Sequence, residues 1–325
     1  MYTETNNACR ILEDPIKVYL DAGLYGRIAD DAGSFKITMD DGRPNRNRYI
    51  NLIVSNYLGQ YRAQMDRRFE ENLEIIKEEC RKETGRVQER AARRLAFKEI
   101  NRGSESGAHS DRSVAIIIDR DNRPLVGEAI NVSFKYEGVS VFLRSLIQSF
   151  MSLPVYRREQ IIFADRLRII NEAIRMKESV KYKNRETGKC HVFSPAVVGY
   201  SMHEYYNYVV GQYVNAYHTI APVRLATMDC VCRSENSAVF TSDFPMLMKR
   251  MLKNGIQFAI QEDRLFRVTL TKEGYDTFSR RYMEQPAPVK KEFRDDGSVV
   301  ITFDCSWFHL NAYFTPFNGQ IIDIE

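Results

Sequence analysis

The sequence predicts an α+β protein built from several domains. Its 325 residues exceed the roughly 100–200 residues of a typical domain. With 44% hydrophobic and 28% charged residues, its composition is that of a globular chain. The first half of the sequence contains both apolar residues at helical spacing and short alternating segments. Strand patterns dominate from about residue 178. We therefore expect three parts, with bounds at residues 1–178, 179–235 and 236–325.

A strand and two helices are expected near the start of the chain. Residues 34–39 alternate apolar and polar side chains, which is typical of a half-buried strand. Tyr49, Ile53 and Tyr57 then recur every four residues, as in an amphipathic helix. Gly59 is expected to interrupt this helix before a second one continues.

The same order returns about ninety-five residues later. Residues 130–136 alternate like a strand, and Phe142, Leu146 and Phe150 repeat the helical spacing. Strand, helix, break and helix occur in the same order both times, which indicates an internal repeat. The two copies are assigned to residues 33–80 and 128–165.

A highly charged stretch, residues 62–100, lies between the two copies. Both signs of charge alternate through it, so it is interpreted as a long solvated helix with ion pairs at i,i+4. Its later part is more one-sidedly basic and could touch phosphate, although the solvated face is favoured. The basic residues of that part are Arg86, Arg90, Arg93, Arg94 and Lys98.

Short strands separated by Gly and Pro turns follow between residues 180 and 225, which indicates a small β-barrel. The last part alternates strands and helices, which indicates an α+β sandwich. Its expected elements are a helix ended by Gly255, strands near Ala259 and Val268, a helix over 272–283, a hairpin turning at 295–297, a helix from Ser306 and a strand over 320–324.

Several classes of protein are disfavoured. The N-terminus has neither the basic flank nor the apolar stretch of a secretory signal, and no apolar run reaches the roughly 18–20 residues of a membrane span. A cytoplasmic protein without a membrane partner is therefore expected. Six cysteines are too sparse for a disulfide scaffold. Cys230 and Cys232, on one predicted strand, should point to opposite faces and not share a metal.

No enzyme signature is visible either. The sequence lacks a P-loop, a dinucleotide-binding fingerprint, a zinc-protease motif and a nucleophile elbow, and its five histidines are scattered. We expect no catalytic residue, no metal and no cofactor. The net charge of +4 permits a nucleic-acid partner without requiring one.

Two strand–helix–helix units that pair their strands resemble the ribbon–helix–helix family, in which outward strand residues enter the major groove of duplex DNA. The resemblance leaves open whether the two copies pair within one chain or between two chains. An outward strand face needs polar residues in any case, so a role in assembly fits equally well. The predicted outward residues are Lys36, Thr38, Asn131, Ser133 and Lys135.

The segment from about Ser179 to Cys232 resembles the WYL domain, a small SH3-like barrel. The run Tyr206-Asn207-Tyr208-Val209-Val210-Gly211-Gln212-Tyr213 carries most of the resemblance, and Pro222-Val223-Arg224-Leu225 matches the family's arginine-bearing strand. The family's Trp-Tyr-Leu triplet stands here as Asn207-Tyr208-Val209, and a second family arginine falls on Thr227. The last part resembles the ferredoxin-like extension that often follows WYL domains.

The WYL resemblance implies a patch of aromatic and basic residues that binds nucleic acid, with rings stacking on unpaired bases and cations contacting phosphates. Tyr206 and Tyr208 share one face, so core packing is as good an interpretation for that pair. His191 is more often a surface or core histidine than a ligand. The predicted patch comprises Tyr182, Lys183, Arg185, His191, Ser194, Tyr206, Tyr208, Gln212 and Arg224.

Taken together, the three parts resemble the WYL-domain accessory proteins of type VI-D CRISPR systems. That resemblance implies a non-enzymatic homodimer that binds single-stranded RNA and stimulates an RNA-guided effector ribonuclease in antiviral defence. A transcriptional regulator remains the rival hypothesis. In that case the ribbon would bind duplex DNA, and the barrel would sense a ligand.

Overall fold

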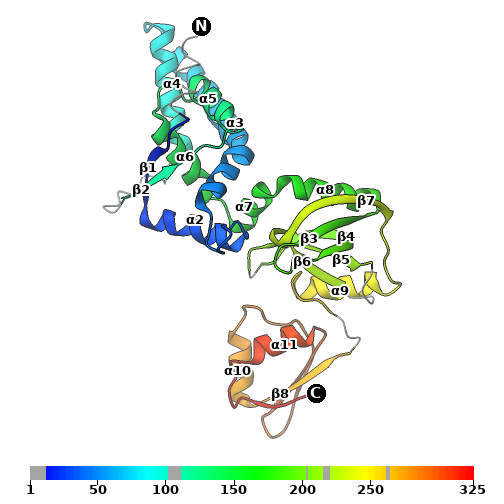
Figure 1. Cartoon of the computed structure of the whole chain (residues 1–325). Helices are drawn as coiled ribbons and strands as arrows, with labels where there is room; N and C mark the ends of the chain where they lie inside the picture. Colours follow the sequence, from blue (N-terminus) through cyan, green and yellow to red (C-terminus); the bar gives the residue numbers. More distant parts are fainter. Residues whose placement is uncertain (1–11, 102–110, 203, 215–219, 261–263) are drawn as a thin grey trace. The chain divides into compact units, whose positions relative to one another are not determined.

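The computed structural model describes residues 12–101, 111–202, 204–214, 220–260 and 264–325. These residues form a mixed α+β architecture with three antiparallel sheets. It divides into two compact units, Met1–Ala164 and Asp165–Glu325, here called the N-terminal and C-terminal units (Figure 1). The three-part division expected from the sequence remains a prediction.

The N-terminal unit is built around a two-stranded ribbon. Strands β1 (Ile16–Asp21) and β2 (Asp111–Ile116) pair antiparallel, with Val18 opposite Val114. Two helices follow each strand: α2 (Ala22–Ser34) and α3 (Arg46–Glu79) after β1, and α5 (Arg123–Val132) and α6 (Val139–Met151) after β2. The unit also contains α4 (Gly85–Ile100) and α7 (Val155–Ile162). Strand, helix and helix therefore occur twice, and the two strands pair within one chain.

Aromatic rings of α3 and α6 form much of the core of this unit. Tyr49, Ile53 and Tyr57 are buried on α3, and Phe142, Leu146 and Phe150 are buried on α6. The ring centroids of Tyr57 and Phe150 lie 5.3 Å apart in an edge-to-face arrangement. Both helix faces predicted from the four-residue spacing are thereby confirmed.

The strand predicted at residues 34–39 is wrong, because this segment ends a helix. The amide of Ile37 donates to the Ala32 carbonyl (2.7 Å) and the amide of Lys36 donates to the Gly33 carbonyl (3.0 Å). Lys36 has a φ of 57°. These bonds form a Schellman motif, which buries Phe35 and Ile37 without a strand. Thr38 makes only an isolated bridge to Pro44.

The strand predicted at residues 130–136 is also wrong. Pro124 lies in the first turn of α5, whose buried residues include Val126 and Ala129, and the helix runs to Val132. Asn131 is an exposed helical residue. Ser133 is fully buried and its Oγ accepts from Arg62 Nε (3.1 Å), whereas Lys135 forms an ion pair with Glu89. The five residues assigned to an outward strand face therefore do not lie on one.

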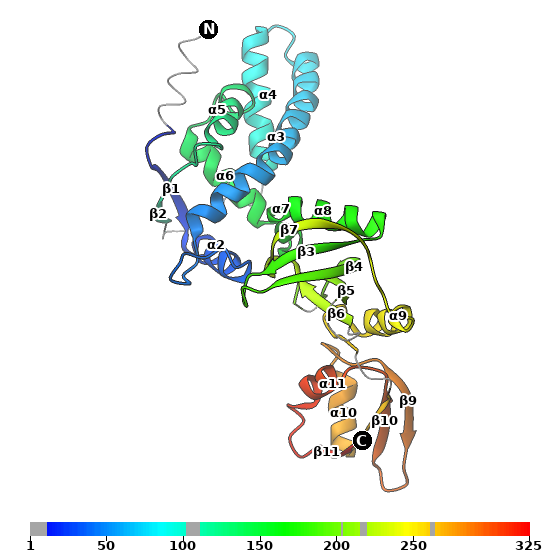
Figure 2. The same cartoon turned by 45° about the vertical axis from the view of Figure 1, so that its right-hand side comes forward.

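The charged stretch forms a hairpin of two helices instead of one long helix. Helix α3 continues through Gly59 to Glu79. The cost of about 1 kcal/mol for a helical glycine is outweighed by the buried Tyr57 and Tyr61 on either side. The chain turns after Cys80, and α4 then lies beside α3 (Figure 2).

The C-terminal unit contains two sheets. The first has five strands in the order β6-β5-β4-β3-β7. Its described strands leave β6 and β7 unpaired with each other, so no closed barrel is formed, and the SH3-like assignment stays a prediction. The bounds are β3 (Glu178–Asn184), β4 (Cys190–Tyr200), β5 (Asn207–Tyr213), β6 (Ile220–Arg224) and β7 (Met228–Ser237), with α8 (Ala164–Met176) before them and a 3₁₀ turn at Leu225–Thr227.

The second sheet has the order β11-β8-β10-β9, and α10 and α11 pack on it. Phe278 of α10, Phe314 of α11 and Ile301 of β10 share its core. The expected strand near Ala259 is wrong, whereas the hairpin turn at 295–297 is confirmed. The bounds are α9 (Phe244–Asn254), β8 (Phe266–Leu270), α10 (Lys272–Arg280), β9 (Pro288–Phe293), β10 (Val299–Phe303), α11 (Trp307–Phe314) and β11 (Ile321–Ile324).

Among the described residues, no single helix has the length and apolar character needed to cross a membrane. Only α6 and α7 taken together pass that test, as a pair bent by 118°.

Candidate functional site

The candidate site is a pocket of about 720 Å³ on the five-stranded sheet, where β3 pairs with both β4 and β7. Lysine, aromatic and cysteine side chains surround a surface that is mainly apolar. This composition is typical of a recess that binds a flat organic group with anionic substituents. The lining residues are Lys181, Tyr182, Lys183, Cys190, His191, Val192, Tyr213, Cys230 and Cys232.

Three rings from three adjacent strands meet at this pocket. Tyr182 on β3 and His191 on β4 are stacked, with centroids 5.4 Å apart, because the two residues are directly opposite in the register. Tyr213 of β5 lies 5.2 Å from His191, and its hydroxyl is 2.9 Å from that of Tyr182. Burial, with the neighbouring Tyr213, raises the pKa of Tyr182 well above its ordinary value. The Tyr182 phenol therefore remains neutral at physiological pH.

Two lysines of β3 add positive charge to the lining of the pocket. Lys181 and Lys183 are exposed and alternate with the buried Tyr182. Lys181 is opposite Val192, and Lys183 is opposite Cys190. The lysines and the rings both line the pocket, and the ammonium groups can contact phosphate.

Cys230 and Cys232 line the same pocket, so the expectation that they face opposite ways is wrong. Side chains two residues apart on a strand point to the same face. The β3–β7 register shifts between Lys181 and Lys183, and Cys230 has a φ of 49°, so β7 also carries a bulge here. Among the described residues, no group of three or more His, Cys, Asp or Glu side chains is arranged to hold a metal ion.

An ion-pair cluster fixes the strand ends beside the pocket. Asp229, next to Cys230, is 2.8 Å from Arg166 of α8 and 3.1 Å from Arg185 of the β3–β4 turn. Burial raises the pKa of Asp229, but the two guanidinium groups lower it further, so the net pKa is below its ordinary value. Arg185, predicted to bind nucleic acid, thus has an acidic partner within the fold.

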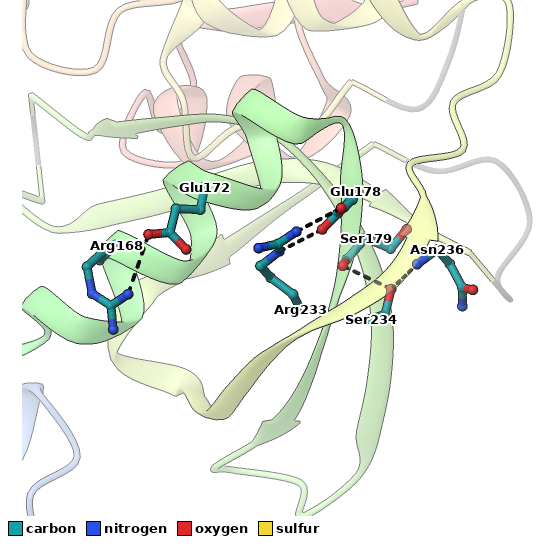
Figure 3. Close-up of polar contacts among 7 residues, drawn as sticks. All are labelled: Arg168, Glu172, Glu178, Ser179, Arg233, Ser234 and Asn236. Carbon is teal, nitrogen blue, oxygen red and sulfur yellow. Dashed lines mark hydrogen bonds and ion pairs between the residues drawn. The ribbon is translucent and has the colours of Figure 1, made fainter.

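The other end of β7 is held to β3 by polar contacts, shown in Figure 3. Arg233 pairs with Glu178 (2.6 Å), and the hydroxyl of Ser234 donates to the Ser179 carbonyl (2.9 Å). β7 is an edge strand of the sheet. It is held at one end by the Asp229 ion pairs and at the other end by the contacts to β3, and its bulge lies between them.

Ser194 and Gln212 are buried and bind the segment after β7. The Oγ of Ser194 accepts from the Val239 amide (2.9 Å) and contacts the Ser179 hydroxyl (3.0 Å). Gln212 accepts from the Thr241 amide and donates to its hydroxyl. Buried polar groups with satisfied hydrogen bonds hold structure in place, and neither side chain lines the pocket.

Tyr206, Tyr208 and Arg224 form a separate group near α9. Tyr208 is buried in a cluster with Phe244 and Met251, and Tyr206 packs against the same cluster. The Arg224 guanidinium is 3.9 Å from the centre of the Tyr206 ring. The two tyrosines share one face, as the alternation predicts, and that face is the core.

The structure therefore brings together three of the nine predicted patch residues, Tyr182, Lys183 and His191, at one pocket. Sequence reasoning missed the contributions of Lys181 and Tyr213 and of the three cysteines. The pairing of β3, β4 and β5 brings Lys181 and Tyr213 to the pocket. The two-residue periodicity of the strands gives only a weak indication of this placement in the sequence. Cys230 and Cys232 are two residues apart on one strand, and that spacing is itself the signal for a shared face.

The comparisons with known proteins identify a shared fold. A solved structure described as "Crystal structure of a CRISPR Cas-related protein" matches with a TM-score of 0.69 and 16% identity, covering 95% of this chain and 88% of that one. Proteasome accessory factor B/C (PafBC) of Arthrobacter aurescens matches with a TM-score of only 0.27 and 11% identity, covering 65% of this chain and 34% of that one. No protein-family model and no curated protein matches the chain. At these identities, the first likeness shows the architecture alone.

Proposed function

We propose that this protein is a non-enzymatic, CRISPR-associated accessory protein that binds single-stranded RNA at the β3–β4–β7 pocket. The shared architecture with a CRISPR Cas-related protein supports the CRISPR context. The pocket, with its three rings and two lysines, supports the ligand class.

The observation that carries the proposal is the combination of Tyr182, His191 and Tyr213 with Lys181 and Lys183 in one recess. A recess can accept a base only when that base is unstacked, which favours single strands over duplexes. Aromatic stacking tolerates any base, and the ammonium groups supply the salt-dependent part of binding. We expect binding with little sequence preference.

The finer parts of the proposal follow the family resemblance. They are a ribbon–helix–helix-like N-terminal region, a WYL barrel, a ferredoxin-like extension, a homodimer in the cytoplasm, and stimulation of the RNA-guided effector ribonuclease of a type VI-D system. An effector cleavage assay with and without the purified protein tests the last part, and an unchanged cleavage rate would contradict it.

The first experiment is a fluorescence-polarisation titration with single-stranded RNA and with duplex DNA, each at low and moderate salt. His191→Ala and Tyr213→Leu each remove a half-buried ring from the pocket. Each is expected to weaken RNA binding about 5- to 150-fold, since stacking contributes roughly 1–3 kcal/mol per base. The control is Tyr205→Ala, because that ring is 54% exposed and does not line the pocket.

An unchanged RNA affinity in both pocket variants would refute the assignment of the pocket. Equal losses in the Tyr205 control would instead show a general effect of removing rings. Circular dichroism on each variant shows whether the fold is intact.

A duplex-DNA-binding regulator is the second candidate function, and the β1–β2 ribbon favours it. Tyr19 is opposite Ser113 in the register, and both side chains are exposed with Lys17 on the same strand face. These polar groups are suited to base edges in a major groove. Tight duplex binding in the titration, lost in Lys17→Gln but kept in the pocket variants, would establish this function instead.

A further inference from the structure

Helix α4 carries a single file of cations on its exposed face. Arg86, Arg90, Arg94 and Lys98 follow one another every four residues, and all four side chains are exposed. Residues four apart on a helix share one face and are about 6 Å apart along its axis. We call this set the α4 stripe.

Arg93, the fifth cation of the helix, does not belong to the stripe. Its side chain contacts α3 and stabilises the fold. Its guanidinium lies 3.9 Å from the centre of the Phe69 ring on α3. It also pairs with Glu89 (3.2 Å) and donates to the Ser133 carbonyl. The structure therefore separates one structural arginine from three arginines and one lysine that face solvent, a distinction that the sequence left open.

No described acid forms an ion pair with the α4 stripe. Both acids of α4 are engaged elsewhere: Glu89 with Arg93 and Lys135, and Glu99 as acceptor from Asn72. Glu137 is half-buried, and burial raises its pKa while the charge of Arg94 partly opposes that rise. That pair does not come within ion-pair distance.

The row of like charges in the α4 stripe destabilises α4 when no anion is bound. Like charges at i,i+4 repel, by roughly 0.2–0.5 kcal/mol for each pair. Arg86 also lies in the first turn of α4, where the helix dipole disfavours a cation. An anion bound along the stripe would relieve both effects, and the helix N-terminus would add to the attraction.

An aromatic ring borders the stripe. The guanidinium of Arg90 is 5.8 Å, and the ammonium of Lys135 is 5.2 Å, from the centre of the Tyr136 ring. Tyr136 is half-buried, so part of the ring remains open to a partner. Cations beside a ring are the combination used to hold a backbone and a base together.

We propose that the α4 stripe is a second RNA-contact surface, which binds the phosphodiester backbone of a single strand independently of the pocket. Arginine guanidinium groups bind phosphate in a bidentate manner. A regular file of cations fits a polymer whose charges also repeat regularly, which favours a nucleic-acid strand over an acidic protein segment. The choice of RNA as the polyanion rests on the proposed function.

The test compares two triple variants of the full chain. Arg86→Gln, Arg90→Gln and Arg94→Gln together remove three charges from the stripe. The matched control, Arg67→Gln, Arg68→Gln and Lys77→Gln, removes three exposed charges from the neighbouring α3. Glutamine keeps a high helix propensity, so both variants should fold, which circular dichroism verifies.

We expect the stripe variant to bind single-stranded RNA about 10- to 100-fold more weakly at moderate salt. The slope of log affinity against log salt should fall by about 2, that is roughly 0.7 for each lost phosphate contact. The α3 control should keep the wild-type slope. An unchanged slope in the stripe variant would overturn the proposal.

The pocket and the stripe are distinguishable in the same assay. If the pocket assignment is wrong, His191→Ala binds RNA with wild-type affinity, and this result does not depend on the stripe variant. A failed stripe assignment leaves the salt slope unchanged whatever the pocket variants do. If polyglutamate or phosphatidylserine–phosphatidylcholine vesicles bind in place of RNA and depend on the stripe, an acidic protein or a membrane surface is the partner, and the proposal is overturned.

Discussion

Arginine–aspartate pairs join distant segments in both units, but with very different exposure. In the N-terminal unit, Arg158 of α7 contacts both carboxylate oxygens of Asp31 on α2, and the two side chains are only 8% and 9% exposed. In the C-terminal unit, Arg166 and Arg185 share Asp229, which is 34% exposed. The chemistry is the same, but the loss of one partner has different consequences.

Burial sets that difference. An unpaired charge in a dry interior retains its full desolvation penalty, whereas an unpaired charge near solvent is rehydrated. Asp31 also accepts from the hydroxyl of Tyr49 (2.8 Å), so the buried pair belongs to a wider network. The Asp229 cluster instead lies beside the pocket, where it positions the bulged strand.

The largest expected effect comes from breaking the buried pair. Arg158→Met should lower the free energy of unfolding by about 3–5 kcal/mol, because Asp31 is left buried without its cation. Urea denaturation measures the change. Arg157→Met, at the exposed neighbouring position, is the control and should have little effect. Adding Asp31→Asn to Arg158→Met should recover part of the loss, and no recovery would show that packing, not charge, is responsible.

The half-exposed cluster should give a smaller effect that depends on pH. Asp229→Asn should lower the melting temperature at pH 7 by about 2–4 °C, on the order of 1 kcal/mol for a partly exposed pair. The folded-state pKa of Asp229 is depressed, so its stabilisation is full above the ordinary carboxyl pKa. It is lost as pH falls through the folded-state pKa, where the variant and the wild type should converge.

Asp165→Asn is the matched control for that series. Asp165 is 91% exposed, and its contact with Arg168 is long, at 3.9 Å. The melting curve of Asp165→Asn should therefore follow that of the wild type at every pH. A gap between wild type and Asp229→Asn that persists in acid would show that the carboxylate charge is not the cause.

The smallest effect is expected at the Arg233–Glu178 pair, shown in Figure 3. The hydrogen bond from Arg233 lowers the pKa of Glu178, but the Arg233 side chain is 37% exposed, so solvent screens the pair. Glu178→Gln should therefore leave the melting temperature within error at moderate salt. A clear loss of stability would show that this pair contributes as the buried Arg158–Asp31 pair does. Exposure would then not explain the difference between the ion pairs.

Several elements could be predicted from the sequence for physical reasons that are local. The face of α6 that carries Phe142, Leu146 and Phe150 repeats with the helical period, and that face is buried. Short strands are expected between residues 180 and 225, and this segment forms β3, β4, β5 and β6. Local periodicity determines such elements when a single face is buried.

The ribbon shows where local patterns fail. Residues 34–39 and 130–136 alternate like strands, yet one segment is a helix cap and the other ends α5. The true strands, Ile16–Asp21 and Asp111–Ile116, are separated by about ninety residues, and in the described part of the chain each has the other as its strand partner. A short alternating run does not specify its partner, so pairing at long range decides which run becomes a strand.

Residue types and periodicity by themselves determined the α+β class, the helix faces and the presence of Tyr182, Lys183 and His191 on neighbouring strands. The tertiary structure alone decided that Tyr208 belongs to the core, that Arg185 is paired with Asp229, and that the α4 stripe faces solvent. It also decided that Cys190 of β4 lines the same pocket as Cys230 and Cys232 of β7. Burial and ion pairing depend on atoms supplied by distant segments, and the local sequence pattern does not encode those atoms.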